Sequence, residues 1–293
     1  MFSRCLILAW LAVGFTVLAA PAHAAFHFMQ IEQVIGGVNG DPAAQAVQLR
    51  MRSTFENFVA GARIRVWDAA GANPVLIIDF VQNVANGQTG DRVLVASENF
   101  IAATNPNAAP DFMMTNLIPA SYLAAGSLTY EDDFGTTYWR LSWGGAGYTG
   151  STFGDTTNDN DPGLFEPANY GPPFPGPLPS TTLQALRFIG PESALSTSNN
   201  MDYAITSGAA GFANNARNSF TVAAPAPVVG DIDGDRVVGL RDHARCAACL
   251  AGPDDFDRPP ACNEHDFTAC DLDEDGDVDL ADFADFYDLL TTP

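Results

Sequence analysis

The sequence predicts a mainly β protein in two modules, an antiparallel β-sandwich followed by a small α-helical unit with two acidic loops. In several short segments before residue 223, apolar and polar residues alternate with a period of two, as in strands with one buried face. Turn-forming residues separate these segments, and no long amphipathic helix interrupts them. After residue 230, one acidic pattern occurs twice.

The chain begins with the pattern of an export signal. Arg4 is followed by an almost wholly apolar run over residues 5–20, and Ala22-His23-Ala24 has the small-x-small form of a cleavage site. The run is too short, and wrongly flanked, for a membrane span. We therefore expect residues 1–24 to be removed and the mature protein to be secreted or held at the cell surface.

The composition agrees with this location and limits the partners. The formal net charge is −22, and all 13 basic residues are arginine. Nucleic acids and anionic membranes bind basic surfaces, so this charge argues against both as partners. About half of the acidic residues lie after residue 230, which indicates that the two parts of the chain are different modules.

Residues 25–222 are expected to form the sandwich. Val47, Leu49 and Met51 alternate with polar residues, and Ile64 and Val66 alternate with arginines, as in half-buried strands. Eight or nine strands are expected in all, with short helical turns at 98–102 and 121–125. The strands lie over residues 26–34, 47–52, 63–66, 75–80, 92–96, 127–132, 136–143, 183–189 and 202–206.

This region resembles bacterial lamin-tail-like domains. The resemblance is carried by the run Phe26–Val34, by Gln48-Leu49-Arg50-Met51, by Trp143-Gly144 and by Asp202-Tyr203-Ala204-Ile205. It implies an immunoglobulin-type sandwich with an adhesive or scaffolding role, and it names no ligand.

A long connection over residues 144–180 is rich in Gly, Thr, Asn, Asp and Pro. Connections of this length are often functional or mobile. Asp155, Asp159 and Asp161 are spaced so that they could hold a cation, although a solvated loop is the favoured interpretation. The Ala/Pro stretch at 223–229 is the expected linker to the last module, residues 230–293.

The acidic pattern in this last module has the spacing of a calcium loop. Acids occupy the first, third, fifth and twelfth places of a twelve-residue segment, so their carboxylates can converge on one ion. The first copy has Asp231, Asp233, Asp235 and Asp242 at these places, and the second has Asp271, Asp273, Asp275 and Asp282. The sequence therefore predicts two calcium sites.

The two loops differ at the sixth place, where glycine allows a sharp turn. Gly276 stands there in the second loop, but Arg236 stands there in the first. A non-glycine residue with positive φ costs roughly 1–2 kcal/mol, so the first site is expected to be weaker. Both loops close with Asp in place of the usual Glu, and a helix-like run follows each.

Two Asp-closed loops, each followed by one helix, resemble a type I dockerin domain over residues 230–290. The family implies that the eight aspartates bind two calcium ions and that the backbone carbonyls of Val237 and Asp277 each add a ligand. It also implies a protein partner. Leu240-Arg241 and Leu280-Ala281 stand where the family has the Ser-Thr pair that recognises cohesin, so the sequence puts cohesin in doubt as the partner.

The last module also contains the four cysteines that remain after signal removal. An even number of cysteines in an exported module indicates two disulfides. Zinc is the alternative, because a Cys-x-x-Cys pair has His243 and His265 nearby. Three pairings are possible; the shorter connection favours Cys249–Cys262, which leaves Cys246–Cys270.

Catalytic motifs are missing from the sequence. It contains no Gly-x-Ser-x-Gly, no His-Glu-x-x-His and no phosphate loop. Glu131, Asp132 and Asp133 are adjacent, but a role at the end of a strand is favoured over catalysis. Paired carboxylates of a glycoside hydrolase depend on spatial separation, so this alternative stays open.

Aromatic residues offer a third interpretation. Trp139 and Trp143, with Tyr138 and Tyr148, could stack on a sugar, although core packing is favoured. We expect an exported, non-catalytic protein that uses a calcium-binding module for attachment or assembly. The alternatives are a carbohydrate-binding protein or a dockerin-bearing glycoside hydrolase in polysaccharide breakdown.

Overall fold

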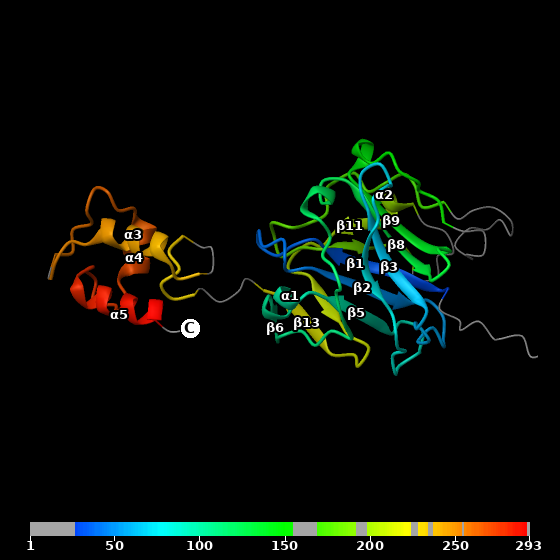
Figure 1. Ribbon diagram of the computed structural model, residues 1–293, viewed down its shortest axis with the longest axis horizontal. Coiled ribbons are helices and arrows are strands. Elements are labelled where there is room, and N and C mark those ends of the chain that lie inside the picture. Colours follow the sequence, from blue (N-terminus) through cyan, green and yellow to red (C-terminus); the bar gives the residue numbers. More distant parts are fainter. Residues whose placement is uncertain are drawn as a thin grey trace, which may run out of the picture. The chain divides into compact units, whose positions relative to one another are not determined.

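The computed structural model describes residues 27–154, 169–191, 198–223, 228–233, 237–253 and 255–291 (Figure 1). The predicted signal, the loop aspartates Asp155, Asp159 and Asp161, and Asp235 and Arg236 lie outside these residues. The chain divides into two compact units between Ala224 and Pro225, within the Ala/Pro stretch. Within the described ranges, the helices lack the length and apolar character needed to cross a bilayer.

The first unit is mainly β, as predicted, and its central sheet has six strands. Their order is β11-β10-β1-β2-β5-β7. The pairing of β5 with β7 is parallel, which differs from the antiparallel sheet expected. Parallel neighbours need a long crossover, and residues 97–111 supply it with α1 (Glu98–Ala102). In sheet order, the strands span Tyr203–Ile205, Leu186–Phe188, Met29–Ile35, Ala46–Met51, Arg92–Ala96 and Phe112–Met113.

A four-stranded antiparallel sheet faces one side of the central sheet, which gives the sandwich (Figure 1). Its order is β4-β3-β8-β9, over Val75–Asp79, Ala62–Trp67, Gly126–Asp132 and Thr137–Trp143. The core between the two sheets includes Ile31 and Leu49 from one sheet and Tyr130, Trp139 and Trp143 from the other. Burying these large side chains supplies the main driving force for folding the unit.

A small third sheet and α1 cover part of the other side of the central sheet. The order is β12-β13-β6, over Gly211–Ala213, Ser219–Val222 and Thr104–Asn105. Phe100 of α1 and Phe212 of β12 pack there with their ring centroids 5.0 Å apart. Strand β2 is therefore buried on both faces, whereas its alternating pattern predicted one buried face.

The expected helical turns are present, since α1 begins at Glu98 and a 3-10 turn, η1, covers Ala120–Tyr122. Another 3-10 turn, η2 (Gly145–Gly147), and the short helix α2 (Asn199–Asp202) lie in the connections and were not predicted.

The second unit contains three helices in the described residues: α3 (Leu240–Cys249), α4 (Glu264–Cys270) and α5 (Leu280–Thr291). Helices α3 and α5 follow the two acidic loops, as predicted. Helix α4 was not predicted, although Asn263 begins it by accepting a hydrogen bond from the Asp266 N–H at 2.9 Å.

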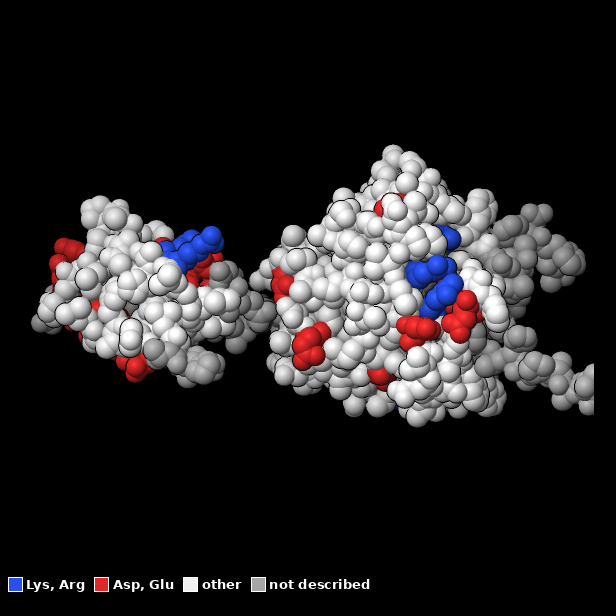
Figure 2. All heavy atoms as spheres, in the orientation of Figure 1, with Lys and Arg blue, Asp and Glu red and all other residues white. Residues whose placement is uncertain are grey.

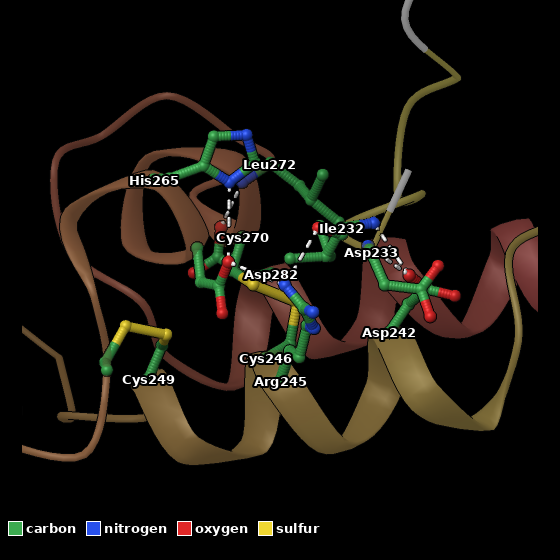
Figure 3. Close-up of a disulfide and its surroundings, with 12 residues drawn as sticks. Ile232, Asp233, Asp242, Arg245, Cys246, Cys249, His265, Cys270, Leu272 and Asp282 are labelled. Carbon is green, nitrogen blue, oxygen red and sulfur yellow. Dashed lines mark hydrogen bonds and ion pairs between the residues drawn. A yellow bond between two sulfur atoms is a disulfide. The ribbon is translucent and has the colours of Figure 1, made fainter. Parts of the chain in front are cut away.

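Two disulfides cross-link this unit, as predicted (Figure 3). Cys246 bonds Cys270 and Cys249 bonds Cys262, with Cα–Cα distances of 5.4 and 4.8 Å. This is the pairing that the sequence favoured. All four cysteines are buried with a few apolar side chains, of which Phe286 is the largest. The zinc alternative is wrong, because the thiolates it requires form disulfides.

Candidate metal centre

The two acidic loops close in the same way. In each loop, the side chain of the last aspartate turns back and accepts hydrogen bonds from three backbone N–H groups of its own loop. The twelfth place thus holds both ends of the loop together.

In the first loop, the closing residue is Asp242, which is almost fully buried. Its Oδ1 accepts from the N–H groups of Ile232 at 2.7 Å and Asp233 at 2.9 Å (Figure 3). Its Oδ2 accepts from the Gly239 N–H at 2.9 Å. Burial raises the pKa of Asp242, but these N–H donors outweigh it and leave the pKa below the ordinary value. The residue is held as a carboxylate.

Asp282 closes the second loop with three equivalent hydrogen bonds. Its Oδ1 accepts from Leu272 at 2.6 Å and Asp273 at 3.3 Å, and its Oδ2 accepts from Asp279 at 2.7 Å. The donors occupy the second, third and ninth places, as they do in the first loop. Since the spacing of the acids is also the same, the two loops are structural repeats.

Carboxylates gather in three groups in the described part of the unit. Within each group, one oxygen from every residue lies within 4.8 Å of the others. The groups are Asp231, Asp233 and Asp242 in the first loop, and Asp271, Asp273 and Asp275, then Asp277, Asp279 and Asp282, in the second.

These groups match the predicted ligand sets in part. In the first loop, the structure brings together three of the four predicted acids; Asp235 is outside the described residues. In the second loop, Asp282 groups with Asp277 and Asp279 and not with the other predicted acids. Asp279 was missing from the sequence-based set, although it is an acid at the ninth place, where calcium loops often bind through water.

The group formed by Asp271, Asp273 and Asp275 contains a buried carboxylate oxygen that accepts no hydrogen bond from the described residues. Oδ1 of Asp271 is buried and has no hydrogen-bond partner among the described residues. Its Oδ2 accepts from the Gly276 N–H at 3.1 Å. A buried carboxylate oxygen without a donor is costly, and a bound cation would remove that cost.

The neighbouring acids add repulsion to this group. Desolvation raises the pKa of Asp273, the Asp275 N–H lowers it, and the charges of Asp275, Asp282 and Asp271 raise it, so that the net shift is upward. A proton or a cation is therefore favoured at this loop.

The turn of the second loop has the glycine that the pattern requires. Gly276 has φ +96°, in the region that favours glycine. Glu274 also has a positive φ, +60°, which the sequence did not indicate. The residue of the first loop that corresponds to Glu274 is Gly234, which lies outside the described residues.

The two residues predicted to bind through carbonyls differ in burial. Val237 is exposed, whereas Asp277 is buried and its N–H donates to Asp275 Oδ1 at 3.2 Å. The atoms of these loops that could bind a metal ion are oxygens, which suit a hard cation such as calcium.

Other proteins give no guide to this site. Comparison with protein families, with characterised proteins and with solved structures yields no match to this chain. The dockerin and lamin-tail resemblances therefore remain predictions, and the assignment of the site rests on the residues described above.

The aromatic platform predicted as an alternative site is not formed, since three of its four residues are buried and Tyr138 is half-buried. Trp139 and Trp143 are fully buried in the core, and Tyr148 is nearly so. The indole N–H groups donate to Tyr203 Oη at 2.8 Å and to the Tyr122 carbonyl at 2.9 Å. These rings have no face open to a sugar.

The adjacent acids at the end of β8 have structural partners. Glu131 is buried and accepts from Arg63 Nε at 3.3 Å and Arg65 Nε at 2.9 Å. Asp132 accepts from the N–H groups of Phe134 and Thr136 in the turn that follows, as its predicted place at a strand end requires. On the face of the β unit in Figure 2, the basic side chains form a patch over the strands around β3, bordered by acidic ones.

Proposed function

We propose that the C-terminal unit is a calcium-binding module and that the exported protein uses it for attachment or assembly, without catalysis. The observation that carries this proposal is the buried Oδ1 of Asp271, which lies without a donor within a group of three carboxylates. A divalent cation with oxygen ligands supplies what this oxygen lacks.

Calcium is favoured over other metals by the donors that are present. Zinc prefers thiolate and imidazole ligands, and the cysteines of this unit are in disulfides. Magnesium keeps several waters and requires near-octahedral geometry, whereas calcium accepts six to eight oxygens in flexible loops. Disulfides also fit an oxidising compartment, in agreement with export to the surface or beyond.

Attachment is supported by the surface of the two helices that follow the loops. Leu240 and Leu280 occupy equivalent places at the starts of α3 and α5, and they are 83% and 75% exposed. Exposed apolar side chains at the positions where dockerins recognise their partner favour a protein partner. Calcium would hold the loops that set the position of these helices.

The test is a thermal melt of the mature full-length protein in chelator, in calcium and in magnesium. Calcium should raise the melting temperature of the C-terminal unit more than magnesium does. Asp271→Asn should remove most of this increase, and Asp285→Asn, an exposed acid of α5 outside the three groups, should leave it unchanged. An increase of equal size in both variants would contradict the assignment.

A further inference from the structure

The connection between α3 and α4 packs against the turn of the second acidic loop. Its described residues are 250–253 and 255–263. Cys249, at the end of α3, bonds Cys262, just before α4, so a disulfide closes the connection (Figure 3). None of the roles above uses this segment, and its contacts indicate one.

A backbone hydrogen bond joins the start of the connection to the second loop. The N–H of Ala251 donates to the carbonyl of Val278 at 3.0 Å. Val278 is the eighth residue of that loop and is fully buried in the core of the unit. Because both partners are backbone groups, this bond fixes the chain of the connection relative to the chain of the loop.

An aromatic side chain of the connection lies beside the turn itself. A Cβ placed on Gly276, the sixth residue of the loop, would be 3.6 Å from Cδ1 of Phe256. Glycine has no side chain, so the ring borders the backbone of the turn. Phe256 is 63% exposed. It therefore adds little to the core of the unit, and its contact with the turn is the more important one.

These two contacts lie on either side of Asp277, which is expected to bind calcium through its backbone carbonyl. Gly276 precedes Asp277 and Val278 follows it. The carbonyl of Asp277 shares a planar peptide unit with the N–H of Val278, so it cannot turn independently of its neighbour. Holding the residues on both sides therefore limits the directions that this carbonyl can take.

The disulfide is what keeps the connection in contact with the loop. Cys249 and Cys262 are buried and lie 13 residues apart in sequence. Without the bridge, the connection would gain conformational freedom that its contacts would have to offset. One hydrogen bond and the edge of one ring contribute less than the entropy of closing a loop of this length. The contacts with the second loop therefore depend on the bridge.

We propose that the Cys249–Cys262 disulfide controls the calcium affinity of the second loop, and that Ala251 and Phe256 transmit its effect. With the bridge formed, the connection holds the turn in its calcium-binding conformation. With the bridge reduced, the connection leaves the turn and the affinity falls. This inference rests on the calcium binding proposed above and adds the way in which that binding is regulated.

The redox step is thiol–disulfide exchange. The two thiols pass two electrons and two protons to a disulfide oxidant, which becomes a dithiol, and a dithiol reductant reverses the step. Disulfides persist in oxidising compartments, so the second loop reaches its full affinity where the exported protein is expected to act. Coupling between two sites is reciprocal, so bound calcium makes the bridge harder to reduce by the same factor.

The test is isothermal titration of the mature full-length protein with calcium chloride, with one loop disabled at a time. Asp231→Asn leaves the second loop to bind calcium, and Asp271→Asn leaves the first. Replacing Cys249 and Cys262 by alanine should weaken binding about tenfold or more in the Asp231→Asn protein, and less than about threefold in the Asp271→Asn protein. Circular dichroism in calcium shows whether the helices of each variant remain.

Phe256 gives a second test that leaves the bridge intact. Phe256→Ala should weaken calcium binding at the second loop about threefold or more, whereas Phe256→Tyr, which keeps the ring, should change it less than about twofold. Leu240→Ala is the matched control, because it removes an exposed apolar side chain at the start of α3, and it should change this binding less than about twofold.

The reciprocal effect is measured on the cysteines. Calcium should raise the dithiothreitol concentration at which Cys262 becomes open to alkylation, by about fivefold or more. Asp271→Asn should abolish this protection. Equal protection in the Asp271→Asn protein would contradict a link between the bridge and the second loop.

The outcomes separate this inference from the calcium assignment. If the second loop bound calcium equally well with and without the bridge, the inference would be overturned and the assignment would stand. Equal losses at both loops would also overturn it, because the bridge would then act only through the general stability of the unit. If the unmodified protein bound no calcium, both proposals would be wrong.

Discussion

Glu56 is a buried carboxyl group of the β unit, and its protonation is linked to folding. Burial raises its pKa from 4.5 to about 7, although the Phe28 N–H, at 3.0 Å, and the charge of Arg52 act in the opposite direction. The folded state therefore binds a proton more tightly than the unfolded state does. The stabilising contribution is fully present below pH 4.5 and is lost as the pH rises through about 7.

We predict that the β unit is less stable at pH 8 than at pH 5 because of this residue, by about 1–3 kcal/mol. In Glu56→Gln, the amide keeps an acceptor for Phe28 but does not titrate, so that part of the pH dependence should disappear. Denaturant unfolding of both proteins at the two pH values measures the difference. Parallel stability–pH curves for the two proteins would show that Glu56 is not the cause.

Gly276 gives a second test at this scale, because only its backbone requires glycine. A Cβ there would meet Phe256 at 3.6 Å, which is ordinary contact, so the cost of Gly276→Ala comes from φ +96°. We predict a loss of about 1–2 kcal/mol in the calcium-loaded C-terminal unit.

Gly211→Ala is the matched control for this substitution. A Cβ at Gly211 meets nothing within 4 Å, and its φ is not positive, so the β unit should change by less than about 0.5 kcal/mol. Denaturant unfolding followed in each unit compares the two variants. If both substitutions changed the free energy of unfolding by the same small amount, the positive φ of Gly276 would not be a source of strain for alanine.

Single residues were predictable where a spacing rule applies to them. The closing acids Asp242 and Asp282 follow from the loop pattern, and so does Gly276. Asp279 and Glu274 were missed, because the pattern says nothing of which extra acid joins a group or which further residue takes a positive φ.

At the scale of elements, alternation predicted the long strands but misjudged their burial. Strand β3 alternates between buried and half-buried residues, as its sequence suggests. Strand β2 carries the same pattern and is buried throughout, because other elements cover its polar face. Strands β6, β7, β12 and β13 have only two to four residues, too few for a period to appear.

Two disulfides cross-link the small C-terminal unit. Because few large apolar side chains are buried in this unit, the cross-links supply stability that a larger hydrophobic core would otherwise provide. We predict that replacing Cys249 and Cys262 by alanine destabilises the unit by about 3 kcal/mol, since the bridge spans 13 residues. Replacing Cys246 and Cys270 should cost slightly more, because that bridge spans 24.

Unfolding by denaturant in calcium, with and without a reductant, measures both effects. The β unit serves as the internal control, because the described disulfides lie outside it. If reductant left the C-terminal unit as stable as before, the cross-links would not have the role given to them here.

At the scale of the whole molecule, the two units should respond separately to calcium. A ligand that binds only the folded state stabilises it by about 2.7 kcal/mol at a hundredfold excess over Kd. We predict that a chelator lowers the melting transition of the C-terminal unit and leaves that of the β unit in place. Calorimetry of the mature protein would show this, and a common shift of both transitions would contradict it.

Composition and the doubled acidic pattern predicted a mainly β unit followed by a small acidic one. The face-to-face arrangement of two sheets followed from the number and length of the strands. The third sheet and the parallel pairing of β5 with β7 did not, because they depend on contacts between residues that are distant in sequence. Helix α4 was not predicted either, because it is short and its only sequence signal is the N-cap residue Asn263.

The two loops should bind calcium with unequal affinity, and isothermal titration of calcium into the chelator-treated mature protein measures this. We predict two bound ions per chain with different affinities, loss of the tighter ion in Asp271→Asn, and tighter binding of the weaker ion in Arg236→Gly. Titration to millimolar calcium that produces no binding heat would show that the loops are not calcium sites.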